Sequence, residues 1–207
     1  DGIASRGLGD VYKRQLEMKL KRSLGQNFLT DSFFLEKIVQ SSQIQKLDDV
    51  IEIGSGDGAL TELILKKSNS LTAIEIDPRF SEKLRKKHID ENFQIHNKDF
   101  LKIDLNEINF EDKVIMGNLP YNVSSQIIFR LLESGLKFRH CVFLIQKELA
   151  NRFLTNQKAT KISIQCQLFC EIEPLFDIPP DAFEPKPKVN STPVSYTHLR
   201  AHETQFH

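Results

Sequence analysis

The sequence predicts an α/β fold in which helices cover both faces of a parallel β-sheet. Short apolar runs of strand length alternate with amphipathic runs of helical length along most of the chain. A glycine loop reading GSGDG, from Gly54 to Gly58, joins the first clear strand to a helix. Strands that alternate with helices form parallel sheets, because each crossover helix returns the chain to the same edge of the sheet.

Length and composition set the limits of this prediction. The chain has 207 residues, of which 40% are hydrophobic, so it can bury the core of one ordinary domain. Its 28 basic and 28 acidic residues balance, and the net charge therefore indicates no class of partner. Cys141, Cys166 and Cys170 lack metal-ligand spacing, which favours reduced core thiols in a cytoplasmic protein. No apolar run reaches the ~20 residues of a membrane span, so we expect neither a membrane partner nor a signal peptide.

Two terminal segments, 1–15 and 195–207, differ abruptly in composition from their neighbours. Neither has helical or strand periodicity, and both resemble translated vector or adapter sequence. We predict that they lie outside the fold and that residues 16–194 form the domain. His198 and His202 have the i, i+4 spacing of helical metal ligands, but in such a tail we predict no metal site.

The first half of the domain is predicted to contain strands and helices in strict alternation. A helix over 33–40 follows a polar segment that contains a glycine. A buried strand over 49–54 then leads through the glycine loop into an amphipathic helix over 59–67. The next strand covers 71–76, and Pro78 starts a helix that runs through residue 85, because proline suits the first turn.

The second half continues the same pattern before it changes. Apolar runs predict strands over 93–96, 114–117 and 141–145, and helices over 124–132 and 147–153.

A β-type pattern follows over 162–172, and six of the eight prolines lie between Pro174 and Pro193. A proline-dense segment of this kind predicts a connector or a rigid loop.

Acidic residues follow successive predicted strands and indicate a nucleoside site. Gly54, Gly56 and Ala59 fit a dinucleotide-binding fingerprint, and Glu75 is placed to accept hydrogen bonds from both ribose hydroxyls, so NAD is one candidate ligand. Asp99 follows the next strand and can accept an adenine amine, while no basic residue suited to a pyrophosphate is evident. Adenosine without phosphates therefore fits best, and S-adenosyl-L-methionine is such a ligand. Its sulfonium needs only weak acceptors, which Glu52 and the loop carbonyls could supply.

The stretch MGNLPYNVSS, from Met116 to Ser125, follows an apolar run and so lies where a buried strand ends. Ligands of open α/β sheets bind at such strand ends. The Asn118 side chain can accept a hydrogen bond from an amine, and Tyr121 offers a flat face to a base. Pro120 has no N–H to compete for the neighbouring carbonyls. Together these residues suit a planar ring that carries an exocyclic NH₂.

Seven segments in the same order resemble the ribosomal RNA adenine N6-dimethyltransferase family. They read SLGQNFLTD, EIGSGDGALT, AIEIDP, NKDFL, GNLPYNVSS, QKELANRF and IPPDAFEPKPKVNS. The resemblance implies a Rossmann-like, seven-stranded sheet and S-adenosyl-L-methionine as methyl donor. It also implies a set of cofactor-binding residues. These are Gln26, Asn27, Leu29, Gly54, Gly56, Glu75, Asp99 and Asn118.

Within the family the chain looks most like the small-subunit enzymes. This implies N6-dimethylation of two adjacent adenosines in a hairpin loop near the 3′ end of the 16S rRNA, as a step of ribosome biogenesis. The expected partner is rRNA in the small subunit or its precursor, and we expect a cytoplasmic monomer. The resemblance gives Tyr121 and Phe183 the role of aromatic partners for the target base, which must be turned out of its stack.

The expected chemistry relies on position rather than on a strong base. Hydrogen bonds from the adenine N6–H to the Asn118 side-chain oxygen and the Leu119 carbonyl would favour the reactive, pyramidal amine. Asn118, Leu119, Pro120, Tyr121 and Phe183 are therefore the predicted catalytic residues. Placing the amine in line with the methyl–sulfonium bond is a proximity effect.

The sequence departs from the small-subunit pattern at three places. Ser55 replaces the usual proline, as in the erythromycin-resistance enzymes that methylate large-subunit (23S) rRNA, whereas Leu119 argues against that type. Thr160 and Lys161 replace a longer Tyr-Gly-Arg-like stretch. The small helical C-terminal domain expected after Val194 is missing, which predicts a truncated product. A 23S rRNA methyltransferase, a non-catalytic ribosome-assembly factor and an NAD-dependent oxidoreductase therefore stay as alternatives.

Overall fold

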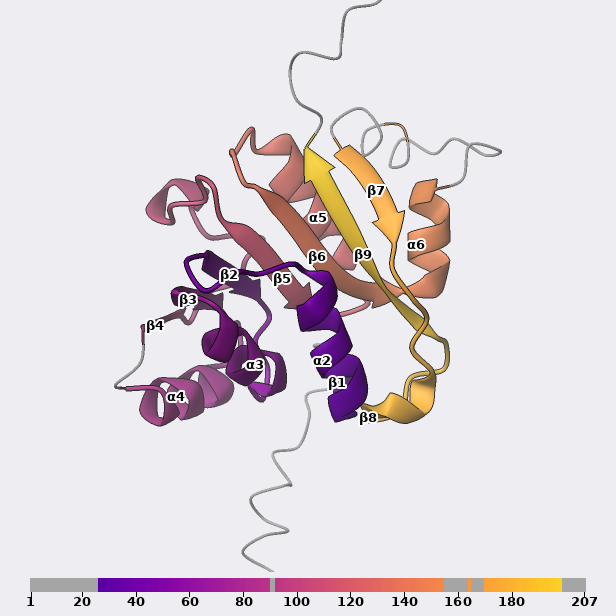
Figure 1. Cartoon of the computed structure of the whole chain (residues 1–207), viewed down its shortest axis with the longest axis horizontal. Coiled ribbons are helices and arrows are strands. Elements are labelled where there is room, and N and C mark those ends of the chain that lie inside the picture. Colours follow the sequence, from indigo (N-terminus) through magenta and orange to yellow (C-terminus); the bar gives the residue numbers. More distant parts are fainter. Residues whose placement is uncertain (1–25, 90–91, 155–163, 165–169, 199–207) are drawn as a thin grey trace, which may run out of the picture.

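The computed structural model describes residues 26–89, 92–154, 164 and 170–198 of the chain. Figure 1 shows a twisted seven-stranded sheet with strand order β4-β3-β2-β5-β6-β9-β7, running from β4 on the left to β7 on the right. Its strands are β2 (Asp49–Ile53), β3 (Ser70–Ile74), β4 (Phe93–His96), β5 (Val114–Asn118), β6 (His140–Gln146), β7 (Cys170–Pro174) and β9 (Ser191–His198). The predicted α/β class and the number of strands are confirmed.

Helices follow the strands at the predicted places. They are α2 (Ser32–Ser41), α3 (Ala59–Lys67), α4 (Pro78–Lys87), α5 (Ser124–Glu133) and α6 (Lys147–Leu154), with short 3₁₀ turns η2 (Leu105–Glu107) and η3 (Pro180–Ala182). Asp31 and Asp77 cap α2 and α4, because their carboxylates accept the Phe33 and Arg79 N–H groups at 2.9 and 3.0 Å. Within the described residues, none of the helices is long and apolar enough to cross a membrane.

Alternating side chains along the strands build a separate apolar core on each face of the sheet. Ile51 and Ile115 point to one face, where they pack with α5 and α6. Val50 and Val114 point to the other face, where they pack with α2 and α3. This follows from the two-residue period of a β-strand, and it explains why these central strands are apolar at every position.

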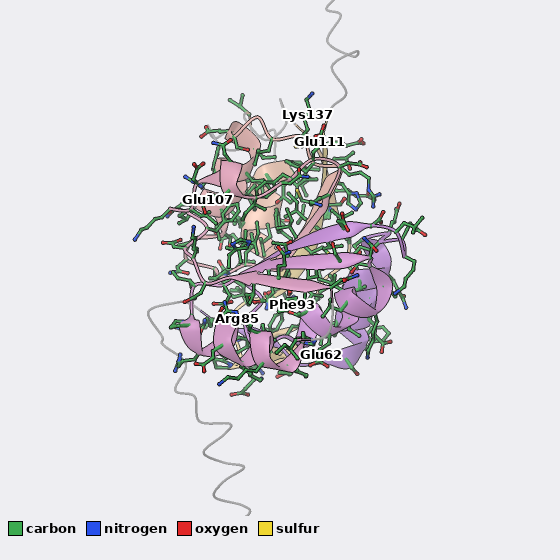
Figure 2. The ribbon with its side chains drawn as sticks, turned by 90° about the vertical axis from the view of Figure 1, so that its left-hand side faces the viewer. Glu62, Arg85, Phe93, Glu107, Glu111 and Lys137 are labelled. Atoms are coloured by element: carbon green, nitrogen blue, oxygen red, sulfur yellow. The ribbon has the colours of Figure 1, made fainter. Side chains whose placement is uncertain are left out.

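The sheet is parallel from β4 to β6 but not throughout. β9 is antiparallel to both β6 and β7, so the parallel arrangement predicted for strands that alternate with helices holds from β4 to β6 and does not extend to β9. β7 and β9 are consecutive strands of this sheet, and antiparallel neighbours need no crossover helix between them. Figure 2 shows the β4 side of the molecule, which lies on the left in Figure 1, with Phe93 of β4, Arg85 of α4 and Glu107 of η2.

The segment 195–198 corrects a second expectation. These residues form the end of β9, paired with β6 and β7, although the sequence was interpreted as lacking strand periodicity there. Tyr196 is only 1% exposed, and its ring lies 5.9 Å from that of Phe143 and 6.2 Å from that of Phe153. Val194 and Tyr196, two positions apart, both point into the core, and this two-residue period is the sequence signal that indicates a strand here. The division into 1–15, 16–194 and 195–207 otherwise stays a prediction, because residues 1–25 and 199–207 lie outside the described ranges.

A small second sheet joins distant parts of the chain. β1 (Phe28–Leu29) pairs with β8 (Phe183–Glu184), and the Asn27 side chain donates to the Pro185 carbonyl at 2.6 Å. The proline-dense segment thus contains η3 and β8. Of the two predicted alternatives, it is an ordered loop and not a plain connector. Of the β-type pattern predicted over 162–172, residues 170–172 are confirmed in β7, residue 164 is helical, and the rest lies outside the described residues.

Candidate functional site

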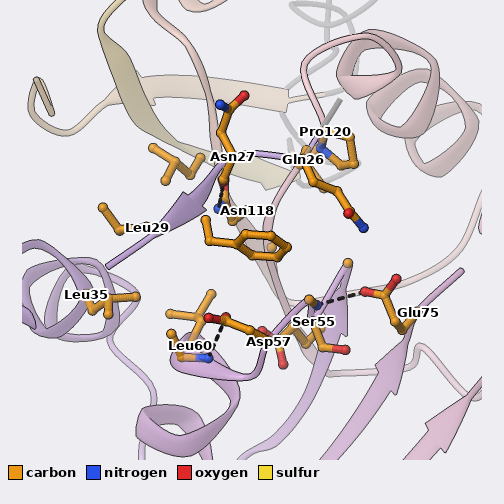
Figure 3. A pocket seen from close by; sticks show the side chains of 18 of the residues that line it. Gln26, Asn27, Leu29, Leu35, Ser55, Asp57, Leu60, Glu75, Asn118 and Pro120 are labelled. Carbon is orange, nitrogen blue, oxygen red and sulfur yellow. Dashed lines mark hydrogen bonds between the residues drawn. The ribbon is translucent and has the colours of Figure 1, made fainter. Parts of the chain in front are cut away.

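A cavity lies where the carboxyl ends of β2, β3 and β5 meet, beneath β1 (Figure 3). The chain proceeds from β2 to β3 and β4 on one side and places β5 on the other, so the cavity is at the topological switch point of the sheet. Such points bind ligands in open α/β folds. The lining residues are Gln26, Asn27, Phe28, Leu29, Leu35, Ile38, Glu52, Gly54, Ser55, Gly56, Asp57, Ala59, Leu60, Glu75, Ile76, Gly117, Asn118, Leu119, Pro120 and Leu144.

The glycine loop and Glu75 form one end of the cavity, which we call the loop end. Gly56 has a φ of +52°, and a Cβ atom there would lie 2.6 Å from the ring carbon Cε1 of Phe28. Gly58 has a φ of +95°, and its Cβ would lie 2.4 Å from the Leu84 side chain. Only glycine combines these backbone angles with such close approach, which explains the GSGDG sequence.

Glu75 holds the loop through main-chain hydrogen bonds. Its Oε2 accepts the Gly56 N–H and its Oε1 accepts the Asp77 N–H, both at 2.8 Å. Burial raises the pKa of this carboxyl, and the two N–H groups oppose the shift. Each carboxylate oxygen has a second lone pair, so Glu75 can still accept hydrogen bonds from a ligand.

Glu52 lies deeper in the same wall and carries an unusual pKa. It is almost fully buried, and its Oε2 accepts the Thr61 hydroxyl at 2.6 Å. Burial, opposed by the Thr61 hydrogen bond and assisted by the nearby Glu75 and Asp57 charges, raises the pKa of this carboxyl to about 8. Glu52 is therefore mostly protonated at neutral pH.

Asn27 and Asn118 form the other end of the cavity, which we call the amide end. The Asn118 Nδ2 donates to the Asn27 carbonyl at 2.9 Å, which leaves the Asn118 Oδ1 as an acceptor. Gly117, just before it, packs so tightly that a Cβ would lie 2.4 Å from the Ile53 carbonyl oxygen. The Pro120 carbonyl accepts the Ser124 hydroxyl at 2.8 Å and so fixes the turn that follows.

Nine of the twelve predicted site residues line the cavity, and three do not. Tyr121 lies beyond the lining, with its hydroxyl 2.5 Å from the Ser191 hydroxyl. Phe183 is 3% exposed within the core on the α2 side. Asp99 caps the turn after β4, where its Oδ1 accepts the Leu101 N–H at 2.9 Å and its Oδ2 lies 3.7 Å from Lys102 Nζ.

Sequence reasoning missed several apolar lining residues. Phe28 covers Gly56 and makes an edge-to-face contact with Phe80 at 5.4 Å. Ile76 follows Glu75 and is 44% exposed, which is unusual for a large apolar side chain at a strand end. An isoleucine directly after the acidic residue at the strand end is the sequence signal for this lining position. Among the described residues, no group of three or more His, Cys, Asp or Glu side chains could hold a metal ion.

Comparisons with known proteins agree with this geometry. The family model of ribosomal RNA adenine dimethylase matches residues 17–206. Ribosomal RNA small subunit methyltransferase A of Mycoplasma mobile is 38% identical over 180 residues, covering 85% of this chain and 69% of the relative. The protein of that name from Chlorobium phaeobacteroides is 38% identical over 189 residues, covering 89% of this chain and 71% of the relative.

Two solved structures have a similar fold. The crystal structure of a dimethyladenosine transferase from Plasmodium falciparum superposes with a TM-score of 0.75 at 30% identity, covering 83% of this chain and 63% of that one. The 23S rRNA methyltransferase ErmE superposes with a TM-score of 0.74 at 26% identity, covering 84% of this chain and 70% of that one. The chain thus spans about 63–71% of the length of these four proteins.

Proposed function

Because the chain belongs to the ribosomal RNA adenine dimethylase family, we propose that it dimethylates adenosine N6 in small-subunit rRNA with S-adenosyl-L-methionine as methyl donor. The observation that carries this proposal is a single cavity with two chemically different ends. A buried carboxylate at the loop end suits a ribose, and the free Asn118 oxygen at the amide end suits an amine. This is the arrangement needed to hold a nucleoside methyl donor against an adenine.

The lining residues fit the methyl donor. The buried oxygens Ser55 Oγ and Gln26 Oε1 have no hydrogen-bond partner among the described residues, so they can bind polar ligand atoms. Glu75 would accept the ribose hydroxyls, and the exposed Ile76 would cover one face of the adenine. When bound, the donor supplies the methyl group on its sulfonium.

The chain's own contribution to methyl transfer is to position the amine. The Asn118 Oδ1 and the Leu119 carbonyl would accept hydrogen bonds from N6–H and direct the nitrogen lone pair toward the methyl group. The Asn118 Nδ2 bond to the Asn27 carbonyl keeps the oxygen facing the ligand. The monomethyl product still has one N–H to donate to these neutral acceptors, so a second transfer is possible.

The three predicted residues outside the lining keep different roles. We assign Tyr121 to stacking on the target base, because its half-buried ring follows Pro120 directly. Asp99 would accept the adenine amine through its outer oxygen. Phe183 would reach a base only after β8 moves, because its side chain is 3% exposed.

The proposed partner is rRNA within the small subunit or its precursor, bound by a cytoplasmic monomer. The test uses small subunits that lack N6-methyladenosine, incubated with the chain and tritiated S-adenosyl-L-methionine. We expect labelled N6,N6-dimethyladenosine after digestion, located by primer extension at two adjacent positions of 16S rRNA.

Label that appears only in 23S rRNA would replace the proposal by the large-subunit alternative. Donor binding without label in either rRNA would favour the assembly factor. An Asn118→Ala variant should lose label. A Lys137→Ala variant is the matched control, because Lys137 is exposed and lies outside the cavity.

A further inference from the structure

The Tyr121 hydroxyl makes a contact that the proposed function does not use. It lies 2.5 Å from the hydroxyl of Ser191, the first residue of β9, although the two residues are 70 positions apart. Ser191 is 0% exposed and Tyr121 is half-buried, and neither residue lines the cavity. Burial, opposed by the Ser191 hydrogen bond, raises the pKa of Tyr121, so its hydroxyl is protonated at neutral pH. The contact is therefore a hydrogen bond between two neutral hydroxyls just beyond the amide end.

The surrounding main chain holds Ser191 in place. The Ser191 N–H donates to the Ile178 carbonyl at 3.0 Å, and the Ser191 carbonyl accepts the Ile178 N–H at 2.8 Å. The hydroxyl of the next residue, Thr192, donates to Asp177 at 2.9 Å, and β9 pairs with β6 from its first residue onward. The start of β9 is thus tied both to the sheet and to the segment that leads into η3. The Ser191 hydroxyl is therefore a fixed point.

The turn that carries Tyr121 is also held by its main chain. The Leu119 N–H donates to the Leu144 carbonyl at 3.1 Å, and the Pro120 carbonyl accepts the Val123 N–H at 3.1 Å. With the main chain fixed on both sides, the tyrosine ring moves only by rotation about its two side-chain torsions. The second of these torsions has a broad energy minimum in tyrosine, so it restrains the plane of the ring weakly. A hydrogen bond at the far end of the ring restrains both torsions.

The plane of this ring matters because the proposed transfer depends on position. An adenine that stacks on Tyr121 takes its plane from the ring, and that plane determines where N6 lies relative to the Asn118 side-chain oxygen. A ring that is already restrained in the free protein also loses less conformational entropy when the base stacks. Loss of the hydroxyl contact leaves the aromatic face in place, so the rate of transfer should suffer more than rRNA binding.

We propose that Ser191 is a positioning residue for methyl transfer, because its hydroxyl holds the Tyr121 hydroxyl and so fixes the plane of the ring on which the target adenine stacks. This inference rests on the proposed function. It gives the start of β9 a role in the reaction besides its role in the sheet.

The test measures methyl transfer by the chain to small subunits that lack N6-methyladenosine. For Ser191→Ala we expect kcat to fall about tenfold, while the KM for the subunits changes less than about twofold. Tyr121→Phe should give the same result, and the double variant should be no slower than either single one, because both changes remove the same contact. Titration calorimetry should show an unchanged Kd for S-adenosylhomocysteine in all three variants, since neither residue lines the cavity.

Thr192→Val is the matched control. Thr192 is the next residue of β9 and is 4% exposed, but its hydroxyl donates to Asp177 and not to Tyr121. Removal of this hydroxyl should lower the thermal unfolding temperature about as much as Ser191→Ala does, because each variant loses one buried hydrogen bond. It should leave kcat unchanged. The control therefore separates positioning of the ring from a general loosening of β9.

Three results with an active wild type would overturn the inference and leave the proposed function intact. A wild-type kcat for Ser191→Ala would show that the reaction does not depend on the hydroxyl contact. An equal fall in kcat for Thr192→Val would assign the effect to the fold of β9. Losses that multiply in the double variant would give the Tyr121 and Ser191 hydroxyls separate roles. A wild-type chain that transfers no methyl group would instead contradict the proposed function, and the inference with it.

Discussion

The loop end and the amide end of the cavity are built in opposite ways. The loop end depends on residues close in sequence, since Gly56 and Glu75 are 19 positions apart and belong to one β-α-β unit. The amide end depends on distant residues, since Asn27 and Asn118 are 91 positions apart and Tyr121 and Ser191 are 70 apart. The loop end is thus encoded within one unit, whereas the amide end exists only after the whole domain has assembled.

The two ends also differ in charge. Buried carboxyl groups with raised pKa values surround the loop end. Neutral amides form the amide end, and the neutral Tyr121 and Ser191 hydroxyls lie beyond it. This difference predicts that pH acts on the loop end of the cavity, while loss of packing acts on the amide end.

The largest expected effect is a loss of folding stability on substitution of Gly117. Gly117→Ala would place a Cβ 2.4 Å from the Ile53 carbonyl oxygen, which is main chain and cannot turn away. We expect a loss of about 3 kcal/mol or more in the free energy of unfolding, measured by urea denaturation. Gly135→Ala is the control, because its Cβ meets no atom within 4 Å and only its φ of +69° is unfavourable, which costs about 1 kcal/mol. Equal losses in the two variants would contradict the tight contact between β2 and β5.

The next effect is a pH dependence of stability that Glu52 controls. The folded-state pKa of about 8 lies above the ordinary value of 4.5, so the folded protein binds more protons than the unfolded chain between these values. Stability from this group is complete below about pH 4.5 and is lost as pH rises toward 8, at about 1 kcal/mol per pH unit. Urea denaturation from pH 5.5 to 7.5 should show this slope in the wild type. Glu52→Gln should remove it, and a parallel slope in both proteins would exclude Glu52 as the source.

A smaller effect is expected for Glu75. Glu75→Ala leaves the buried Gly56 and Asp77 N–H groups without their acceptors and should cost about 2 kcal/mol in stability. Glu75→Gln retains one acceptor oxygen and should lose about half as much. The exposed Glu111→Ala serves as the matched control in the same denaturation series and should be neutral. A neutral Glu75→Ala would mean that the loop end does not depend on these bonds.

The smallest effect concerns the amide end and its long-range support. Tyr121→Phe and Ser191→Ala each remove one partner of the same hydroxyl pair, and each should cost about 1 kcal/mol. The double variant should cost no more than either single one, because the interaction is already lost. Strictly additive losses in a double-mutant cycle would show that the two hydroxyls are not coupled.

The difference between local and long-range contacts explains which features could be predicted from sequence. Helix α3 begins at Ala59 and ends at Lys67 as expected, because its signals, a glycine loop and an amphipathic period, are local. Glu75 lies at the carboxyl end of its strand as expected for the same reason, although β3 ends at Ile74 and not at Ile76. The pairing of β1 with β8 and the antiparallel place of β9 depend on which distant segments meet, which no local pattern contains.

The predictions for Asp99 and Phe183 illustrate this limit of local sequence patterns. Asp99 was expected in the cavity because it follows a strand, but the turn after β4 directs its Oδ1 to the Leu101 N–H instead. Phe183 was assigned to a base through resemblance alone, and its burial follows from the pairing of β8 with β1. Strand-end position predicts the edge of the sheet on which a residue lies, but not the direction of its side chain.

The place of β9 has a consequence for how the chain folds during synthesis. β9 is the last described strand to leave the ribosome, yet it lies between β6 and β7 and is the only neighbour of β7 in the described sheet. A nascent chain that has emerged through β7 therefore exposes one unpaired edge of the apolar strand β6, whose other edge pairs with β5, and leaves β7 without its neighbour in the described sheet. Unpaired edges of this kind pair readily with other chains. We expect the interval between synthesis of β6 and β9 to be when this protein is most prone to aggregate and most in need of a chaperone.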